Sequence, residues 1–134
     1  MRRSILAALL SATATLADAA MPAATDALKA GVLTPVMAAP ALKLQGSDGK
    51  PLDLERFRGK VVLLAFGFSN CGEVCPITLA TLAGARRKLG PDAARDVQVV
   101  YVTVDPERDD AARMRKFLGA FDATFIGGDR KSVV

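Results

Sequence analysis

One stretch decides the fold of this chain: VVLLAFGFSNCGEVCP, residues 61–76. Residues 61–66 form a continuous apolar run of strand length, which predicts a strand buried on both faces of a parallel sheet. Residues 67–70 predict a turn. Pro76 suits the first position of a helix and favours an extended, cap-like conformation at Cys75. The stretch therefore predicts a strand, a turn and a helix, with both cysteines of the chain at the helix N-terminus.

The predicted position of Cys71 and Cys75 favours reactive sulfur. Unpaired backbone N–H groups and the positive end of the helix dipole stabilise a thiolate relative to a thiol. Thiolates attack disulfides and bind soft metals. A tight turn can bring the two Cα atoms within the roughly 4.4–6.8 Å that a disulfide requires, and the same pair could chelate a metal. A purely structural disulfide is the weaker interpretation, because it would close only a few residues.

Alternating and helical patterns around this stretch predict an α/β fold. Apolar residues alternate with polar ones on both sides of a polar turn at 42–54, which predicts a β-hairpin. After a short turn at 54–60 and the strand, a helix is predicted at 76–89, ended by Gly90-Pro91. The side chains expected to face inward from this helix are Leu79, Leu82, Ala83 and Leu89.

The second half of the chain predicts further elements of the same sheet. β-Branched residues at 97–104 predict a second central strand, parallel to the first. A helix at about 109–119 and a brief strand at 123–126 follow. Because ligands collect where parallel strands end, the segment Asp105–Asp109 is expected close to the two cysteines. Asp105 could equally serve only as a helix cap.

The chain has 134 residues, of which 51% are hydrophobic, and this allows one ordinary domain. Residues 1–19 combine two arginines, an apolar run and small residues, which predicts a secretory signal peptide. Residues 20–40 are rich in Ala and Pro and predict a linker. We therefore expect an exported, periplasmic protein, or one anchored to the inner membrane if the leader is not cleaved. The net charge of +4 is not gathered into basic runs, so nucleic-acid binding is not expected.

Three motifs together resemble the Sco/SenC family. They are the aromatic turn Phe66-Gly67-Phe68, the Cys-x-x-x-Cys-Pro site at 71–76, and the segment Val-Asp-Pro-Glu-Arg-Asp at 104–109. The resemblance covers roughly residues 41–128. It implies a thioredoxin-like α/β fold for this part of the chain.

The resemblance also implies chemistry and partners. Sco/SenC proteins handle copper and serve the assembly of cytochrome c oxidase. Cys71 and Cys75 would bind one copper ion, as Cu(I) or Cu(II), with a histidine from a later hairpin as the third ligand. The implied partner is a copper-accepting oxidase subunit or another thiol protein.

The chain departs from the family pattern in two places. Gly72-Glu73 stands where the family commonly has Pro-Asp, so the acid is kept but the loop loses rigidity. The chain contains no histidine, and it stops where the family continues into a hairpin and a last helix. We therefore expect an incomplete domain. Residues 129–134 are expected to be a non-native tail, because they can be encoded by DNA that resembles a sequencing adapter.

Two functions from different classes remain open on the sequence. One is a metallochaperone that binds copper through Cys71 and Cys75. The other is a thiol-disulfide oxidoreductase that reduces a partner's cysteines. Glu73 and Asp105 are candidates for orienting the site loop or tuning the thiolates. Peroxidase chemistry lacks its Thr-x-x-Cys setting, and a structural zinc site would need four N or S ligands.

Overall fold

The computed structural model describes residues 31–129. The predicted signal peptide, the first part of the linker and residues 130–134 lie outside this range. The chain divides into two units, residues 1–38 and 39–134. In the described part of the first unit, residues 31–38, there is no helix or strand. All elements that position the site belong to the second unit.

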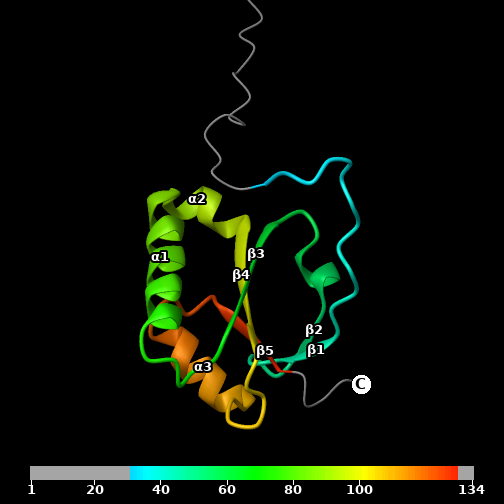
Figure 1. Cartoon of the computed structure of the whole chain (residues 1–134). Coiled ribbons are helices and arrows are strands. Elements are labelled where there is room, and N and C mark those ends of the chain that lie inside the picture. The colour runs from blue at the N-terminus through cyan, green and yellow to red at the C-terminus, as the bar shows by residue number, and fades with distance from the viewer. Residues whose placement is uncertain (1–30, 130–134) are drawn as a thin grey trace, which may run out of the picture. The chain divides into compact units, whose positions relative to one another are not determined.

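The second unit is built on a five-stranded mixed sheet in the order β2-β1-β5-β4-β3 (Figure 1). Strands β3 and β4 pair in parallel along their whole length, and β5 pairs in parallel with β4. Strand β1 pairs antiparallel with both β2 and β5. The strands are β1 Leu44–Gly46, β2 Pro51–Leu52, β3 Val61–Gly67, β4 Val97–Thr103 and β5 Ile126–Asp129.

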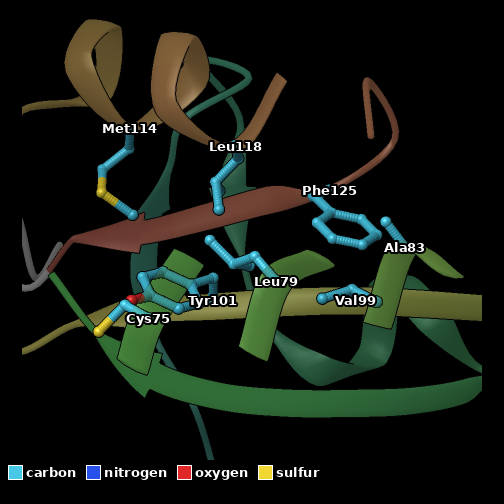
Figure 2. Close-up of a cluster of buried hydrophobic side chains, with 8 residues drawn as sticks. All are labelled: Cys75, Leu79, Ala83, Val99, Tyr101, Met114, Leu118 and Phe125. Carbon is cyan, nitrogen blue, oxygen red and sulfur yellow. The ribbon is translucent and has the colours of Figure 1, made fainter. Parts of the chain in front are cut away.

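Two helices, α1 and α3, cover one face of this sheet (Figure 1). Their bounds are α1 Val74–Lys88 and α3 Ala111–Gly119, and a short helix α2, Gly90–Arg95, follows α1. The core between helices and sheet is drawn in Figure 2. Its buried members are Cys75, Leu79, Ala83, Val99, Tyr101, Met114, Leu118 and Phe125. Burial of this apolar area stabilises the fold and fixes α1 against the sheet, with the start of α1 following the carboxyl end of β3.

The opposite face is covered only in part. On this face Leu44 of β1, Leu52 of β2 and Phe57 of the 3-10 helix η2, Leu54–Phe57, pack with Val100 and Val102 of β4. Strand β3 lies at the edge of the sheet, and Phe66 on this face is 63% exposed. The prediction that residues 61–66 are buried on both faces was therefore wrong. An apolar run of strand length does not reveal what covers it.

The hairpin, both long strands and both long helices are confirmed, but several boundaries differ from the prediction. Helix α1 begins at Val74, so Cys75 and Pro76 lie within its first turn rather than at and after a cap. Proline is compatible with the whole first turn, where no intrahelical N–H bond is lost. Leu89 is 49% exposed and lies beyond the helix end, contrary to the prediction that it faces inward.

The other differences concern short elements. Helix α2 was not predicted, and Gly90 starts it with a positive φ of 77° that turns the chain after α1. Strand β5 begins at Ile126, three residues later than predicted. The reason is a turn in which Asp122 accepts hydrogen bonds from the backbone N–H and the hydroxyl of Thr124. Such side-chain bonds compete with strand pairing.

Candidate functional site

Cys71 and Cys75 lie on either side of the start of α1. Cys71 is partly exposed in the loop between β3 and α1, whereas Cys75 is buried in the first turn of the helix. Both are free thiols. The backbone N–H of Cys75 donates a hydrogen bond to Sγ of Cys71, with an N–S distance of 3.4 Å. The structure thus brings both predicted sulfurs to one helix N-terminus.

Their surroundings make the two sulfurs chemically different. The side chain and the backbone N–H of Cys75 both hydrogen-bond to the Cys71 sulfur and lower the pKa of the Cys71 thiol, and the backbone at Glu73 and Val74 adds to this effect. A lower pKa means that more thiolate is present near neutral pH. Cys71 is therefore the accessible nucleophile and Cys75 the shielded partner.

Gly67 and Tyr101 form the floor beneath Cys75. A Cβ added at Gly67 would overlap the hydroxyl of Tyr101 and would lie 2.8 Å from Sγ of Cys75. Only glycine therefore allows the ring and the sulfur to lie against the end of β3. Burial, followed by the hydrogen-bonding and charge of Cys75, raises the pKa of the Tyr101 hydroxyl, so the hydroxyl keeps its proton.

Asp109 fixes the loop that precedes Cys71. Its side chain is fully buried and accepts hydrogen bonds from the backbone N–H of Ser69 at 2.9 Å, from the Ser69 hydroxyl, and from the Thr103 hydroxyl at 2.7 Å. Arg113 lies 3.8 Å from the carboxylate and donates to the Ser69 hydroxyl at 2.7 Å. One carboxylate thus joins the site loop to the end of β4 and to α3.

The pKa of Asp109 reflects these contacts. Burial by itself raises the pKa of the carboxyl, but the hydrogen bonds from Ser69 and Thr103 and the positive charge of Arg113 outweigh burial. The net result is a pKa below the ordinary value for aspartate. Asp109 is therefore charged at neutral pH and holds its donors strongly.

Asp105 and Glu73, the candidates for orienting the loop, occupy other positions. The Asp105 carboxylate accepts a hydrogen bond from Arg108 at 2.6 Å, and its backbone N–H donates to the Thr103 hydroxyl. Glu73 stands at the N-cap of α1, and its side chain makes no capping hydrogen bond. The segment 105–109 does lie beside the site loop, but it is Asp109 that contacts the loop.

Sequence reasoning missed Asp109, Tyr101 and Gly67 as parts of the site. The sequence predicts Asp109 only as the start of a helix, although Asp109 belongs to the segment Asp105–Asp109 that is expected close to the cysteines. Tyr101 is the single tyrosine of the chain and lies between two valines in the predicted strand, and this was an available signal. Gly67 had a signal in its position between two aromatic residues.

The donor set suits a soft metal better than a hard one. Two thiolate sulfurs are ligands that favour Cu(I) over oxygen-seeking cations. Within residues 31–129 no cluster of three or more His, Cys, Asp or Glu side chains could surround a metal ion. The two sulfurs fit a soft ion such as Cu(I), and residues 31–129 supply no closed set of four ligands for structural zinc.

The fold and the paired cysteines define a thioredoxin-like α/β protein with a dithiol at a helix N-terminus. The SCO1/SenC family model matches residues 37–133, and the chain belongs to this family. Among curated proteins, the mouse mitochondrial SCO2 homologue is 43% identical over 81 residues, which cover 59% of this chain and 31% of the mouse protein.

Solved Sco structures share the fold. The copper-bound ScoI of Bradyrhizobium japonicum matches with a TM-score of 0.63 and 33% identity, over 67% of this chain and 57% of that one. A structure of BsSco matches with a TM-score of 0.57 and 30% identity, over 69% and 56% of the two chains. It is described as showing a disulfide switch in a member of the Sco family of cytochrome c oxidase assembly proteins. The chain thus spans little more than half of each solved relative.

No helix within residues 31–129 has both the length and the apolar character needed to cross a bilayer.

Proposed function

We propose that this chain carries copper as cargo, bound by Cys71 and Cys75, and delivers it to a copper-accepting subunit of cytochrome c oxidase. The observation that carries the proposal is the pair of free thiols at the start of α1, one accessible with a lowered pKa and one shielded. Thiolates select soft Cu(I). The copper-bound ScoI structure and the assembly role named for the Sco family support the same chemistry.

In this proposal the two sulfurs have different roles in transfer. Cys75 is buried and fixed in the first helical turn, so it holds the ion in place. Cys71 lies in the loop and is accessible, so an incoming thiol of the acceptor can exchange with it first. The network around Asp109 limits the movement of the loop during exchange.

A Cu(I) titration under anaerobic, reducing conditions tests this function. The chain competes with a Cu(I) chelator of known affinity, next to Cys71→Ser, Cys75→Ser and the control Asp92→Asn, which changes a side chain on α2 that is 95% exposed. We expect one equivalent to bind, with affinity reduced on the order of 100-fold or more in each cysteine variant. Equal affinity in the cysteine variants and the parent chain would refute the copper proposal.

A thiol-disulfide oxidoreductase activity is the second candidate, and the lowered pKa of Cys71 favours it. The Cys71 thiolate attacks a partner disulfide and releases one partner thiolate. Cys75 then attacks the mixed disulfide, which leaves a Cys71–Cys75 disulfide and a second partner thiol. The partner gains two electrons and the chain loses two, so an external thiol reductant must restore the chain. Trapping of a mixed disulfide by Cys75→Ser, but not by Cys71→Ser, is the expected result.

We further propose that the chain is exported to the periplasm, with residues 1–19 as signal peptide and residues 20–40 as linker. A reporter that is active only after export, fused after residue 40, should be active. Replacement of Arg2 and Arg3 by glutamate should reduce the export. Reporter activity without residues 1–19 would contradict this proposal.

A further inference from the structure

The exposed face of α1 carries no charged side chain over the first twelve residues of the helix. Residues 74–85 lie between Glu73 and Arg86, and none of them is Asp, Glu, Lys or Arg. By contrast, α3 has three Arg or Lys side chains in nine residues. A surface helix normally turns charged or polar side chains to water. The composition of the α1 face therefore calls for an explanation.

The side chains on this face are apolar or have their polar atoms already bonded. Val74 and Ile77 are 70% and 58% exposed. The hydroxyl of Thr78 donates a hydrogen bond to the carbonyl of Val74 at 2.9 Å, and the hydroxyl of Thr81 donates to the carbonyl of Ile77 at 2.8 Å. The remaining exposed residues of this stretch are alanines. The face thus offers a partner apolar contact and no charge.

This face begins beside the accessible sulfur. Val74 follows Cys71 by three residues, and Sγ of Cys71 accepts a hydrogen bond from the backbone N–H of Cys75, so the sulfur lies at the first turn of α1. Twelve helical residues extend about 18 Å. A stable interface of about 800 Å² per partner has a radius of about 16 Å if it is circular. An interface centred on Cys71 therefore reaches over Val74 and Ile77.

The nearest charges along the helix stand at the two ends of this face. Glu73 precedes the face beside Cys71, and Arg87 and Lys88 follow it in the last turn of α1. An uncharged centre with a charged rim is the usual anatomy of a protein–protein interface. A partner complements this surface when apolar side chains flank its thiol. A charged flank would lose its water on the uncharged centre without gaining an opposite charge.

We propose that the exposed face of α1 is the docking surface for the thiol-bearing partner of Cys71, and that it selects partners whose cysteine is flanked by apolar side chains. The juxtaposition of an uncharged, exposed helix face with an accessible sulfur carries the inference. It rests on the proposed function in one respect, namely that a partner thiol exchanges at Cys71. Copper transfer and disulfide exchange both meet this condition.

Two peptide disulfides test the selection on the reduced chain. Each peptide has one cysteine in a mixed disulfide with a coloured aromatic thiol. The cysteine is flanked by leucine and valine in one peptide and by serine and asparagine in the other, at equal net charge. The Cys71 sulfur attacks the cysteine sulfur of the peptide, a disulfide forms between chain and peptide, and the aromatic thiolate leaves with the electron pair of the broken S–S bond. The colour of this thiolate gives the rate of the first step.

Each rate is divided by the rate of free cysteine with the same peptide. On this scale we expect the parent chain to react roughly 10-fold faster with the apolar peptide than with the polar one. Val74→Ser and Ile77→Ser should each lower this ratio about 3-fold. The control Leu89→Ser should leave the ratio unchanged, because Leu89 is 49% exposed and lies beyond the far end of the helix. An unchanged ratio in both variants, or an equal fall in the control, would overturn the inference.

The small neutral disulfide of mercaptoethanol separates docking from the reactivity of the sulfur. This reagent has no flanking side chains, so its rate should be the same in the parent chain, Val74→Ser and Ile77→Ser. A fall with this reagent as large as the fall with the apolar peptide would assign the effect to the sulfur or to the fold, and the docking surface would be rejected.

The outcomes separate this inference from the proposed function. If the parent chain reacts with neither the peptides nor the small disulfide, exchange at Cys71 fails and the docking surface fails with it. If the chain binds Cu(I) but reacts equally fast with both peptides, only the docking surface fails. Sedimentation gives a further outcome, since a dimer of the parent chain that Ile77→Ser dissociates would assign the face to a second copy and overturn the partner named here.

Discussion

At the scale of single residues, the position of the site loop depends on one buried carboxylate, that of Asp109. Asp109 has no exposed surface, yet it is charged and accepts three hydrogen bonds from Ser69 and Thr103. Because it ties the site loop to the sheet, it contributes to the stability of the fold and to the position of Cys71 together.

The pH dependence of stability follows from the lowered pKa of Asp109. A group whose pKa is lower in the folded than in the unfolded chain stabilises the fold above its unfolded pKa, about 3.9, and this stability is lost as the pH falls through the folded value. When the pH is lowered below about 4, we expect the urea concentration at the midpoint of unfolding to decrease in the parent chain. Asp109→Asn should weaken this pH dependence. A matched control is Asp92→Asn, because the Asp92 side chain is 95% exposed.

Removal of the Asp109 carboxylate should also destabilise the chain at neutral pH. Asp109→Ala leaves the donors of Ser69 and Thr103 without their acceptor, and we expect a loss of about 2–4 kcal/mol in the free energy of unfolding. Urea unfolding measures this loss. Equal stability of Asp109→Ala and Asp92→Ala would contradict the role given to the buried carboxylate.

Gly67 provides a residue-scale test of the close approach of Tyr101 to Cys75. Gly67→Ala places a methyl group where the Tyr101 hydroxyl lies, and we expect the free energy of unfolding to fall by about 2 kcal/mol or more. Gly72 is the control, since a Cβ there meets nothing within 4 Å. Thermal unfolding of both alanine variants should separate them clearly, and similar midpoints would show that the floor of the site is not tightly packed.

At the scale of elements, two helix starts shape the site. Helix α1 offers its first N–H groups to Cys71, and α3 carries Arg113 to Ser69. The start of α3 is defined by Asp110, whose carboxylate accepts a hydrogen bond from the backbone N–H of Arg113 at 2.7 Å. The cap of α3 thus lies within three residues of a side chain that contacts the site loop.

Two variants of Asp110 test how much its capping hydrogen bond stabilises α3. Asp110→Ala removes the cap and should cost about 1 kcal/mol of stability, whereas Asp110→Asn keeps a capping oxygen and should cost much less. Urea unfolding, with the reactivity of Cys71 toward a thiol reagent as a second readout, checks this. Equal losses in the two variants would mean that charge, rather than capping, is what matters at this position.

At the scale of the whole second unit, one sheet face is unevenly covered. Phe66 and Val104 are 63% and 61% exposed, and both line an apolar groove together with Leu42 and Leu44. Exposed apolar patches bind apolar dyes and favour association. The hairpin side chains and η2 cover this face only in part, so both large side chains stay open to solvent.

We therefore expect the chain to bind an apolar fluorescent dye, and Phe66→Ser to reduce this binding more than Ile77→Ser does. Ile77 is similarly exposed, at 58%, but it lies on α1 and away from the groove. Dye fluorescence at equal protein concentration, with sedimentation to measure association, checks the prediction. Equal reductions in the two variants would argue against a localised patch.

The order of elements and the place of both cysteines could be predicted from the sequence, because apolar period, turn residues and Pro76 are local signals. The exposure of Phe66 could not be predicted, since an apolar strand looks the same whether or not a partner covers it. The roles of Asp109 and Tyr101 were missed for a related reason. Both depend on which residues the sheet register brings together, and register is a property of the folded chain.

That register has a consequence for how the site can fail. Tyr101 and Thr103 stand two residues apart on β4, opposite Ala65 and Gly67 of β3, so both side chains point to the helix side. A slip of one residue between these strands would turn both away together. Cys75 would lose its neighbouring hydroxyl, and Asp109 would lose a donor, in the same event. Mispaired molecules should therefore be recognisable by altered thiol reactivity even where their helix content is normal.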